Sequence, residues 1–586
     1  MTVAIAIVIL FFMLNALSAI DWRSAATWRS LKNRTRPGRG TPGRTTPGCG
    51  MDSAEYVLAD RALAGPALLA TLAASNLSAF TIFGVSGASY RLGWAFFPVM
   101  AFGTAFMAFS FAVIGLPLRR LSAERGWTTP GEFVADRFGS HALGRIFSAL
   151  SLVYTIPYLA VQTGAGGRLL AGLTGLPVAA GSALLIGLVA AYVYKGGMRS
   201  VVRTDLVQLG ALIILALAAG ALVLSAAGPS GAMVTAGADT ARMSRAGVDA
   251  TLGWLPLLGY YVLWGLADPM FPHFIQRFYA ARSDRALLSG MIAYPAVAVL
   301  VFLPICAIGV LGATLAPGLQ GRASDGIFSI LTTMLAGPVW GPVFSVAALA
   351  ALMSTMDSQL LSCASMIGTD FLPIRRRGTP AFAAANAGAN AGAALMLAVG
   401  AWLVSLRPPA SILDFLGRTA FPGYASLAPV AIAGIYAPWI GKRTAGLALL
   451  AGTALVVIQS AGLFTPPLPT ALFNLGIQVL VLGVGVLASF IGRKKPAKAA
   501  GVNQAKQSRS YGRNPQVAHK AALAAVVGMG ALGIDFWQYG PARMFVPGLP
   551  WWVVYHTGLT LALSLVFWWY ARTVPAAQRL ATTESF

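Results

Sequence analysis

The sequence predicts an all-α polytopic membrane protein, and three features of the chain support this fold class. Hydrophobic residues make up 57% of the 586 residues, charged residues make up only 10%, and the mean hydropathy is +0.71. This composition is too apolar for a soluble globular chain of this length. Segments of about 20 apolar residues recur along the chain, and each is long enough to cross a bilayer. Basic residues collect between these segments.

Fifteen apolar segments qualify as membrane-spanning helices. With ends good to a few residues, they lie at about 2–20, 65–90, 95–116, 146–167, 178–194, 204–226, 252–273, 286–311, 338–363, 380–403, 411–436, 444–463, 470–492, 521–540 and 551–571. Alternate loops hold 34 of the 42 Lys and Arg residues, so those loops face the cytoplasm by the positive-inside rule. The amino terminus is then expected outside and the carboxyl terminus in the cytoplasm. The first segment follows no basic region, which favours a retained helix over a cleaved signal peptide.

Several function classes do not fit this pattern. The net charge of +24 arises from loop topology, whereas nucleic-acid binding would need a basic, aromatic-rich soluble domain. The three cysteines and four histidines are scattered, so neither a disulfide framework nor metal-ligand spacing is indicated. No nucleophile, base and metal converge in the sequence. We therefore expect no catalytic residues, no enzyme activity and no nucleic-acid partner.

Two low-complexity stretches, at 35–50 and 494–516, are rich in Gly, Pro, Lys or Arg and predict flexible cytoplasmic linkers. They divide the chain into six predicted parts. These are an extra amino-terminal membrane helix at 1–21, a basic linker at 22–54, a ten-helix core at 55–436, two additional helices at 437–492, a second basic linker at 493–520, and a two-helix hairpin with its tail at 521–586. The hairpin tip, FWQYGPARMFVPGLPWW, places Trp and Tyr at the membrane interface.

The first and sixth helices of the core combine polar residues with helix breakers in mid-segment. The first contains AASNLSAFTIFGVSG and the sixth contains WGLADPMFP. Interrupted helices at corresponding positions of two five-helix halves indicate a secondary transporter built from inverted repeats, with its site at the breaks. Freed carbonyls at such breaks can coordinate a cation. Simple packing kinks at Gly and Pro are the alternative for either segment.

Five motifs, in chain order, resemble the sodium:solute symporter family, whose members share the LeuT-type five-plus-five fold. They are ASNLSAFTIFGVSGASYRLGW, TTPGEFVADRFGS, GGMRSVVRTDLVQ, PHFIQRFYAA and MSTMDSQLL. The resemblance covers residues 55–436 and extends to about 492. In the third core helix, IPYLAVQTGAGGRLL is similar to the branch that includes monocarboxylate and pantothenate carriers. The terminal hairpin resembles small two-helix membrane proteins that accompany some of those carriers. Within TTPGEF, Thr129, Pro130 and Glu132 also predict a helix capping box.

The resemblance gives a role to the polar residues in the apolar stretch 350–365. Hydroxyl and carbonyl oxygens suit a hard cation. The family pattern implies a sodium site formed by the side chains of Ser354 and Thr355 with the backbone carbonyls of Ala74, Leu77 and Ala351. Interhelical hydrogen bonds made by Ser and Thr are the alternative. Sodium, as the coupling ion, is the only metal or cofactor expected.

Asp357 lies in the same stretch, and a carboxylate at membrane depth is costly unless it is paired or ion-bound. Some family members carry a second sodium site, which here would consist of Asp205, Ser354, Asp357 and Ser358. Two neighbouring carboxylates imply a bound cation or a shared proton. The alternative is that Asp205 pairs with Arg203 or Arg277 while Asp357 faces water in an inward cavity.

The resemblance places the solute site beside the two breaks. The candidate solute-binding residues are Ser75, Asn76, Ser78, Tyr158, Gln162, Tyr261, Trp264, Asp268 and Phe421. Any of the aromatic residues could instead belong to the core. Asp268 departs from the family pattern and favours a basic group or a hydroxyl on the solute.

The sequence therefore predicts a bacterial inner-membrane symporter that imports a small polar organic solute, most simply a carboxylate, by sodium-coupled alternating access. Its expected partners are the solute, Na⁺ and the lipid bilayer, and its functional unit is expected to be a monomer. A membrane sensor or regulatory protein that retains a transporter core, and a proton-coupled carrier, are the alternatives. The solute, the number of coupled ions and the role of the hairpin stay open at this stage.

Overall fold

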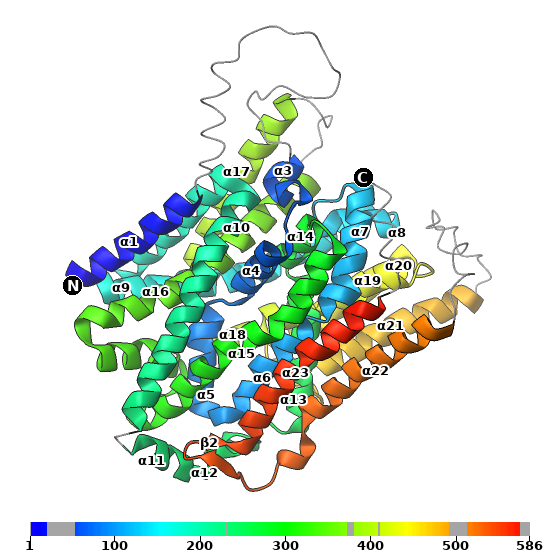
Figure 1. Ribbon diagram of the computed structural model, residues 1–586. Helices are drawn as coiled ribbons and strands as arrows, with labels where there is room; N and C mark the ends of the chain where they lie inside the picture. Colours follow the sequence, from blue (N-terminus) through cyan, green and yellow to red (C-terminus); the bar gives the residue numbers. More distant parts are fainter. Residues whose placement is uncertain are drawn as a thin grey trace.

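A computed structural model describes residues 2–19, 53–228, 231–371, 380–407, 411–491 and 513–574. Helices make up nearly all of this part of the chain, and most of them run roughly side by side (Figure 1). The first predicted linker, at 22–54, lies outside the described residues apart from its last two, which begin α3 at Ser53. So does the second, apart from its last residues, which begin a helix at Arg513.

The amino-terminal part and the first half of the core contain these elements in chain order: α1 (Thr2–Ala19), α3 (Ser53–Leu58), η1 (Ala59–Arg61), α4 (Gly65–Asn76), η2 (Phe80–Gly84), α5 (Val85–Leu92), η3 (Gly93–Ala95), α6 (Phe96–Met107), η4 (Phe111–Gly115), α7 (Leu116–Arg125), α8 (Pro130–Phe138), α9 (His141–Thr174) and α10 (Val178–Ala227). The fourth and fifth core helices are joined in α10, which kinks at Gly197. Gly197 has φ +54°, and a Cβ there would lie 2.5 Å from the Tyr56 carbonyl oxygen, so glycine permits both the kink and the close contact.

Short elements connect the two halves: α11 (Ala232–Ala238), α12 (Thr240–Met243) and η5 (Val248–Ala250). The second half contains α13 (Trp254–Ala267), η6 (Asp268–Met270), α14 (Pro272–Ala280), α15 (Asp284–Leu315), η7 (Gly321–Gly326), α16 (Ile327–Met366), η8 (Ile367–Phe371), α17 (Pro380–Ser405), α18 (Ile412–Arg418) and α19 (Ala420–Tyr436). The remaining elements are α20 (Lys442–Ser460), α21 (Thr470–Ile491), α22 (Arg513–Ile534), η9 (Phe536–Gln538), β1 (Met544–Val546), β2 (Leu549–Pro550) and α23 (Trp551–Thr573).

The predicted breaks of the first and sixth core helices are both present. The first helix stops at Asn76, and Leu77 is extended with φ −77° and ψ 99° before helical structure resumes. The sixth stops at Ala267, makes a single 3₁₀ turn and becomes extended at Phe271 with φ −57° and ψ 129°. Each break exposes backbone polar groups inside the bundle, where a ligand can use them.

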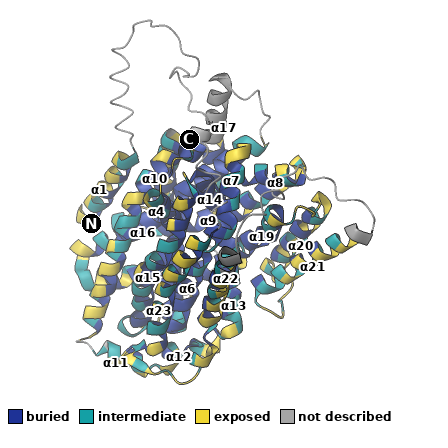
Figure 2. Cartoon of the chain, turned by 45° about the vertical axis from the view of Figure 1, so that its right-hand side comes forward, coloured by how far each residue is buried: buried dark blue, intermediate teal, exposed yellow. Residues whose placement is uncertain are grey.

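The apolar outer surface fits a protein that spans a membrane. Within the described part of the chain, ten helices are long and apolar enough to cross a bilayer, while α13 and α19 are shorter than the length required. The count of fifteen spans therefore stays a prediction. Exposed residues follow the outer faces of α20 and α21, where Leu447 and Leu487 are about 60% exposed (Figure 2). Lipid rather than water suits such a surface.

The capping box predicted in TTPGEF is confirmed at the start of α8. The Thr129 hydroxyl accepts a hydrogen bond from the Glu132 amide at 3.2 Å, and the Glu132 carboxylate accepts one from the Thr129 amide at 3.3 Å. The Thr129 hydroxyl also donates to Asp370 at 2.8 Å, and the Ser148 hydroxyl donates to the other Asp370 oxygen at 2.6 Å. These contacts tie the end of α16 and η8 to α8 and α9.

The last two helices form a hairpin that packs on the core. Its tip contains η9 and a short antiparallel pair in which Met544 lies opposite Pro550. Helix α23 packs against α6 and α15, and α22 lies against α23, α6 and α13 (Figure 1).

Candidate functional site

The break in α4–α5 faces the middle of α16. The Ser354 hydroxyl donates to the Ala74 carbonyl at 2.8 Å and lies 3.2 Å from the Ala351 carbonyl oxygen. The Thr355 hydroxyl lies 3.2 Å from the same Ala351 oxygen and 3.3 Å from the Ser75 carbonyl oxygen. Two hydroxyls and three carbonyls from two helices thus gather at one place, and both side chains are buried. This is an oxygen set of the kind that a hard cation takes.

Leu77, the remaining residue predicted for the sodium site, lies in the break itself. The amide of Thr81 bonds to the Ser78 carbonyl at 2.9 Å, whereas in a regular α-helix it would take the carbonyl of Leu77. The Leu77 carbonyl therefore does not accept the hydrogen bond from Thr81 that it would accept in a regular helix. Ser75 was not among the carbonyls expected at this site, and its contact with Thr355 places it there as well.

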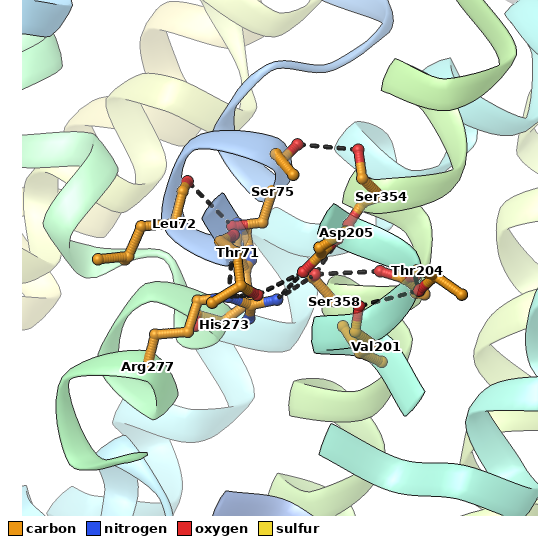
Figure 3. Close-up of polar contacts among 12 residues, drawn as sticks. Thr71, Leu72, Ser75, Val201, Thr204, Asp205, His273, Arg277, Ser354 and Ser358 are labelled. Atoms are coloured by element: carbon orange, nitrogen blue, oxygen red, sulfur yellow. Dashed lines mark hydrogen bonds and ion pairs between the residues drawn. The ribbon is translucent and has the colours of Figure 1, made fainter. Parts of the chain in front are cut away.

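Next to these oxygen atoms, Arg277 of α14 forms an ion pair with Asp205 of α10 (Figure 3). Its Nη2 lies 3.2 Å from Asp205 Oδ2 and 2.5 Å from the Ser358 hydroxyl, and its Nε donates to the Thr71 hydroxyl at 2.8 Å. The Thr71 hydroxyl in turn donates to Asp205. Asp205 and Arg277 are both fully buried. Of the two arginines considered as partners for Asp205, the structure therefore pairs it with Arg277.

Asp357 points instead toward α10. Its carboxylate accepts hydrogen bonds from the Tyr192 hydroxyl at 2.8 Å, the Thr204 hydroxyl at 3.2 Å and the Ser358 hydroxyl at 3.1 Å. Asp357 is fully buried, so the alternative in which it faces water is wrong for this conformation. Within the described residues, Asp357 has no ion pair. The two buried carboxylates, Asp205 and Asp357, therefore have only the one positive charge of Arg277 to balance them in this group of three residues.

Aromatic rings fill the space beside the two breaks. Trp264 and Phe421 lie with ring centroids 4.9 Å apart, and Tyr158 lies 5.5 Å from Phe421. Phe80, at the start of η2, lies 5.9 Å from Trp264. Phe271, in the second break, lies 5.6 Å from Tyr158. Three of the predicted solute residues therefore meet in one cluster, and two phenylalanines that were not predicted join it.

Polar groups border this cluster. The Asn76 amide donates to Asp268 Oδ2 at 3.2 Å and to the Tyr294 hydroxyl at 2.7 Å, and all three residues lie at or beside the breaks. The Gln162 side-chain oxygen accepts from the Ala79 amide at 2.7 Å, inside the first break. Among the described residues, the buried Gln162 Nε2 and Trp264 Nε1 have no hydrogen-bond partner. Two donors and one carboxylate are thus available at the breaks.

The hydroxyls of the other three predicted solute residues already have hydrogen-bond partners. The Ser75 hydroxyl donates to the Leu72 carbonyl of its own helix at 3.2 Å, and the Ser78 hydroxyl accepts from the Phe80 amide at 3.1 Å. Tyr261 stands apart from the cluster. Its hydroxyl donates to the Gly533 carbonyl of the terminal hairpin at 2.9 Å, and its ring lies 5.3 Å from that of Phe102.

Sequence reasoning missed Tyr192, Thr204 and Tyr294. Tyr294 occupies the middle of α15 without a distinguishing motif, and Tyr192 precedes the kink of α10. Thr204 is the exception, because it directly precedes Asp205 in the RTDLVQ motif. The position of Thr204 beside a carboxylate at membrane depth was a signal that could have marked it.

The model of the sodium:solute symporter family matches residues 56–452, which is more than half of the sequence. The chain belongs to the sodium:solute symporter family. It is accordingly a multi-pass membrane protein of a bacterial symporter family, as the motifs at the two breaks and in α16 predicted.

Two curated members of the symporter family show how widely the similarity extends. The sodium/pantothenate symporter of Haemophilus influenzae is 25% identical over 445 residues, which cover 75% of this chain and 90% of that protein. The osmoregulated proline transporter OpuE of Bacillus subtilis is 28% identical over 467 residues, which cover 77% of this chain and 91% of that protein.

The fold matches a solved symporter structure as well. A Na⁺-coupled sialic acid symporter in a substrate-bound, outward-open state aligns with a TM-score of 0.66 at 16% identity. The alignment covers 85% of this chain and 99% of that one. This likeness, together with the two broken helices, confirms the predicted LeuT-type fold of this symporter family member.

Proposed function

We propose that the protein is a sodium-coupled symporter that imports a small organic solute bearing a carboxylate. The observation that carries the proposal is the meeting of the Ser354 and Thr355 hydroxyls with the Ala74, Ser75 and Ala351 carbonyls at the break of the first core helix. A sodium ion there would be bound by these oxygens and by the freed carbonyl of Leu77. It would join α4 to α16 and, by reciprocal coupling, lower the free energy of solute binding in the same conformation.

The groups at the breaks support a solute that carries both a carboxylate and a hydrogen-bond donor. The Gln162 Nε2 and Trp264 Nε1 donors, which lack partners among the described residues, suit a carboxylate. Asp268 is buried and suits an ammonium or hydroxyl group. Proline combines a carboxylate with an amine, and pantothenate combines a carboxylate with hydroxyls. The solute site then comprises Asn76, Tyr158, Gln162, Trp264, Asp268 and Phe421, with Ser75 and Ser78 contributing backbone.

A second cation is proposed at Asp357 rather than between the two aspartates. Arg277 already neutralises Asp205 and bonds to Ser358, so it occupies the place between two members of the second site predicted from the sequence. Asp357 keeps a buried charge that Tyr192, Thr204 and Ser358 stabilise only through hydroxyls. Either a sodium ion or a proton on Asp357 would balance that charge. If a proton balances the charge, the protein would be a proton-coupled carrier, which is the second candidate function.

The proposed orientation has the amino terminus outside and the carboxyl terminus in the cytoplasm of a bacterial inner membrane, with a monomer as the functional unit. The domain boundaries predicted from the sequence are kept as part of this proposal. Single cysteines at Thr41 and Asn503 should be protected from an impermeant reagent added to intact cells. A cysteine at Leu463, which is 78% exposed between α20 and α21, should react. Labelling at position 41 or 503 would show that the protein has the opposite orientation.

A thermal-shift screen of purified protein against a metabolite panel tests the transport proposal. The panel includes L-proline and pantothenate, each in sodium chloride and in choline chloride. Binding stabilises the folded state by RT ln(1 + [L]/Kd), about 2.7 kcal/mol at a hundred times Kd, so a true solute raises Tm and does so more strongly with sodium. A protein whose Tm responds neither to sodium nor to any carboxylate would contradict the proposal.

A further inference from the structure

A buried ion pair joins the carboxyl-terminal hairpin to a loop of the core. Arg245 lies between α12 and η5, and Asp535 follows α22. Arg245 Nε lies 2.8 Å from Asp535 Oδ2 and Nη2 lies 2.8 Å from Oδ1, so the contact is bidentate. Neither side chain is exposed. The Nε2 atom of His556, on α23, lies 2.9 Å from the same carboxylate. Bidentate geometry gives such a pair directional specificity as well as energy.

Residues of the hairpin surround Arg245 and hold the neighbouring loop. The guanidinium carbon lies 5.1 Å from the centre of the Tyr539 ring and 5.3 Å from that of Trp552. The Tyr539 hydroxyl donates to the Leu252 carbonyl at 3.2 Å, and the Trp552 indole donates to the Met243 carbonyl at 3.1 Å. These bonds bracket the loop from Met243 to Leu252, which leads directly into α13.

A second connection reaches α13 itself. The Tyr261 hydroxyl donates to the Gly533 carbonyl at 2.9 Å. Glycine at position 533 lets the Phe102 ring pack against the same point of the hairpin, because a Cβ there would lie 2.2 Å from that ring. Tyr261 and Trp264 are three residues apart on α13 and therefore share a face. Both rings lie against Gly103 of α6, where a Cβ would be 2.9 Å from Trp264 and 3.1 Å from Tyr261.

We propose that Arg245, Asp535 and Tyr261 are positioning residues, through which the carboxyl-terminal hairpin holds α13 and thereby Trp264 at the solute site. The inference rests on the proposed function, since Trp264 contacts solute only under that proposal. Apolar packing alone would anchor a hairpin in the membrane. The directed polar bonds described above end instead on α13 and on the loop before it.

Hydrogen exchange of the full-length protein in nanodiscs, followed by mass spectrometry, tests this positioning without any solute. Tyr261→Phe removes one buried hydrogen bond between hairpin and core, so the amides of 254–267 should exchange about fivefold faster. Tyr555→Phe is the matched control. Its hydroxyl donates to the Leu532 carbonyl at 2.9 Å, a bond that lies within the hairpin. This control should leave exchange in α13 at the wild-type rate.

The ion pair is tested by Asp535→Asn and by the double variant Arg245→Met with Asp535→Asn. The single change leaves the Arg245 charge buried and unpaired, which can prevent folding, whereas removing both charges is much better tolerated. The double variant should fold and still show faster exchange across 243–267. Wild-type exchange of α13 in both Tyr261→Phe and the double variant would overturn the proposal and leave the hairpin a passive anchor.

A binding measurement separates this inference from the proposed function. With L-proline or pantothenate as the probe, Tyr261→Phe should raise the solute Kd several-fold while the sodium affinity measured without solute is unchanged. A wild-type protein that binds neither sodium nor any carboxylate refutes the proposed function, yet the exchange result in α13 still decides the role of the hairpin. Wild-type solute affinity in Tyr261→Phe counts against positioning.

Discussion

Arg277 and Asp205 form an ion pair in which neither side chain is exposed, with Nη2 and Oδ2 3.2 Å apart. Arg277 comes from α14 and Asp205 from α10, and the same guanidinium bonds to Thr71 of α4 and Ser358 of α16. One buried cation thus links four helices next to the proposed sodium site. Its contacts with Asp205 and Ser358 show that these two residues already have a resident positive charge.

Asp205→Asn should therefore reduce stability and leave the sodium dependence of transport unchanged in shape. Breaking a buried ion pair from one side costs about 3 to 5 kcal/mol, because the other charge is left uncompensated. Thermal unfolding in detergent measures the loss. The double variant Asp205→Asn with Arg277→Met should recover part of it. If the single variant unfolds normally but its Hill coefficient for sodium falls, Asp205 binds an ion directly, as the sequence first suggested.

Asp357→Asn should change the shape of the sodium dependence of transport and leave the stability of the protein close to that of the wild type. The side chain has only hydroxyl partners, so its neutralisation removes the charge that would hold a second cation and costs little structure. The Hill coefficient for sodium should fall toward one while the fold is kept. If the balancing ion is a proton, the variant should instead lose the pH dependence of uptake that the wild type shows. A wild-type curve that is already non-cooperative and is unchanged in Asp357→Asn leaves a single sodium site.

Ser354→Ala and Thr355→Ala should each weaken the apparent sodium affinity at least tenfold. Each removes one of the two hydroxyl oxygens from a site whose other ligands are carbonyls, and tenfold corresponds to about 1.4 kcal/mol. Ser362→Ala is a matched control, since Ser362 is buried on the same helix and its hydroxyl donates to the Gln359 carbonyl of that helix. Its sodium affinity should equal that of the wild type. Equal sodium affinity in all three variants would remove Ser354 and Thr355 from the site.

The breaks and the hydroxyl pair were predictable because local sequence encodes them. Polar residues and Gly around Asn76, and polar residues with Pro around Asp268, mark places where a helix is easily interrupted. Ser354 and Thr355 lie within one short motif. The partner of Asp205 was not predictable in the same way. Arg203 is two residues from Asp205 in the sequence and Arg277 follows the sixth core helix, so the choice between them depends on how α14 docks against α10. The contact between Tyr261 and Gly533 joins residues 272 positions apart, and no local pattern specifies it.

Asp268 provides the sharpest test of what the solute carries. Its carboxylate is buried, and among the described residues it has no ion pair, so an ammonium group on the solute would gain a charge-assisted bond there. A hydrogen bond to a charged group contributes about 1.5 to 3 kcal/mol, which predicts roughly a ten- to hundredfold rise in Kd for an amino-acid solute in Asp268→Asn. A hydroxyl can still donate to the oxygen of the new amide, so the Kd of a hydroxylated solute should change much less.

L-proline and pantothenate, measured by thermal shift in the presence of sodium, represent these two classes. Asp136→Asn is the control for lost charge, because that carboxylate pairs with Arg125 on the surface. If each solute binds Asp268→Asn with the same Kd as the wild type, the donor group of the solute lies away from Asp268.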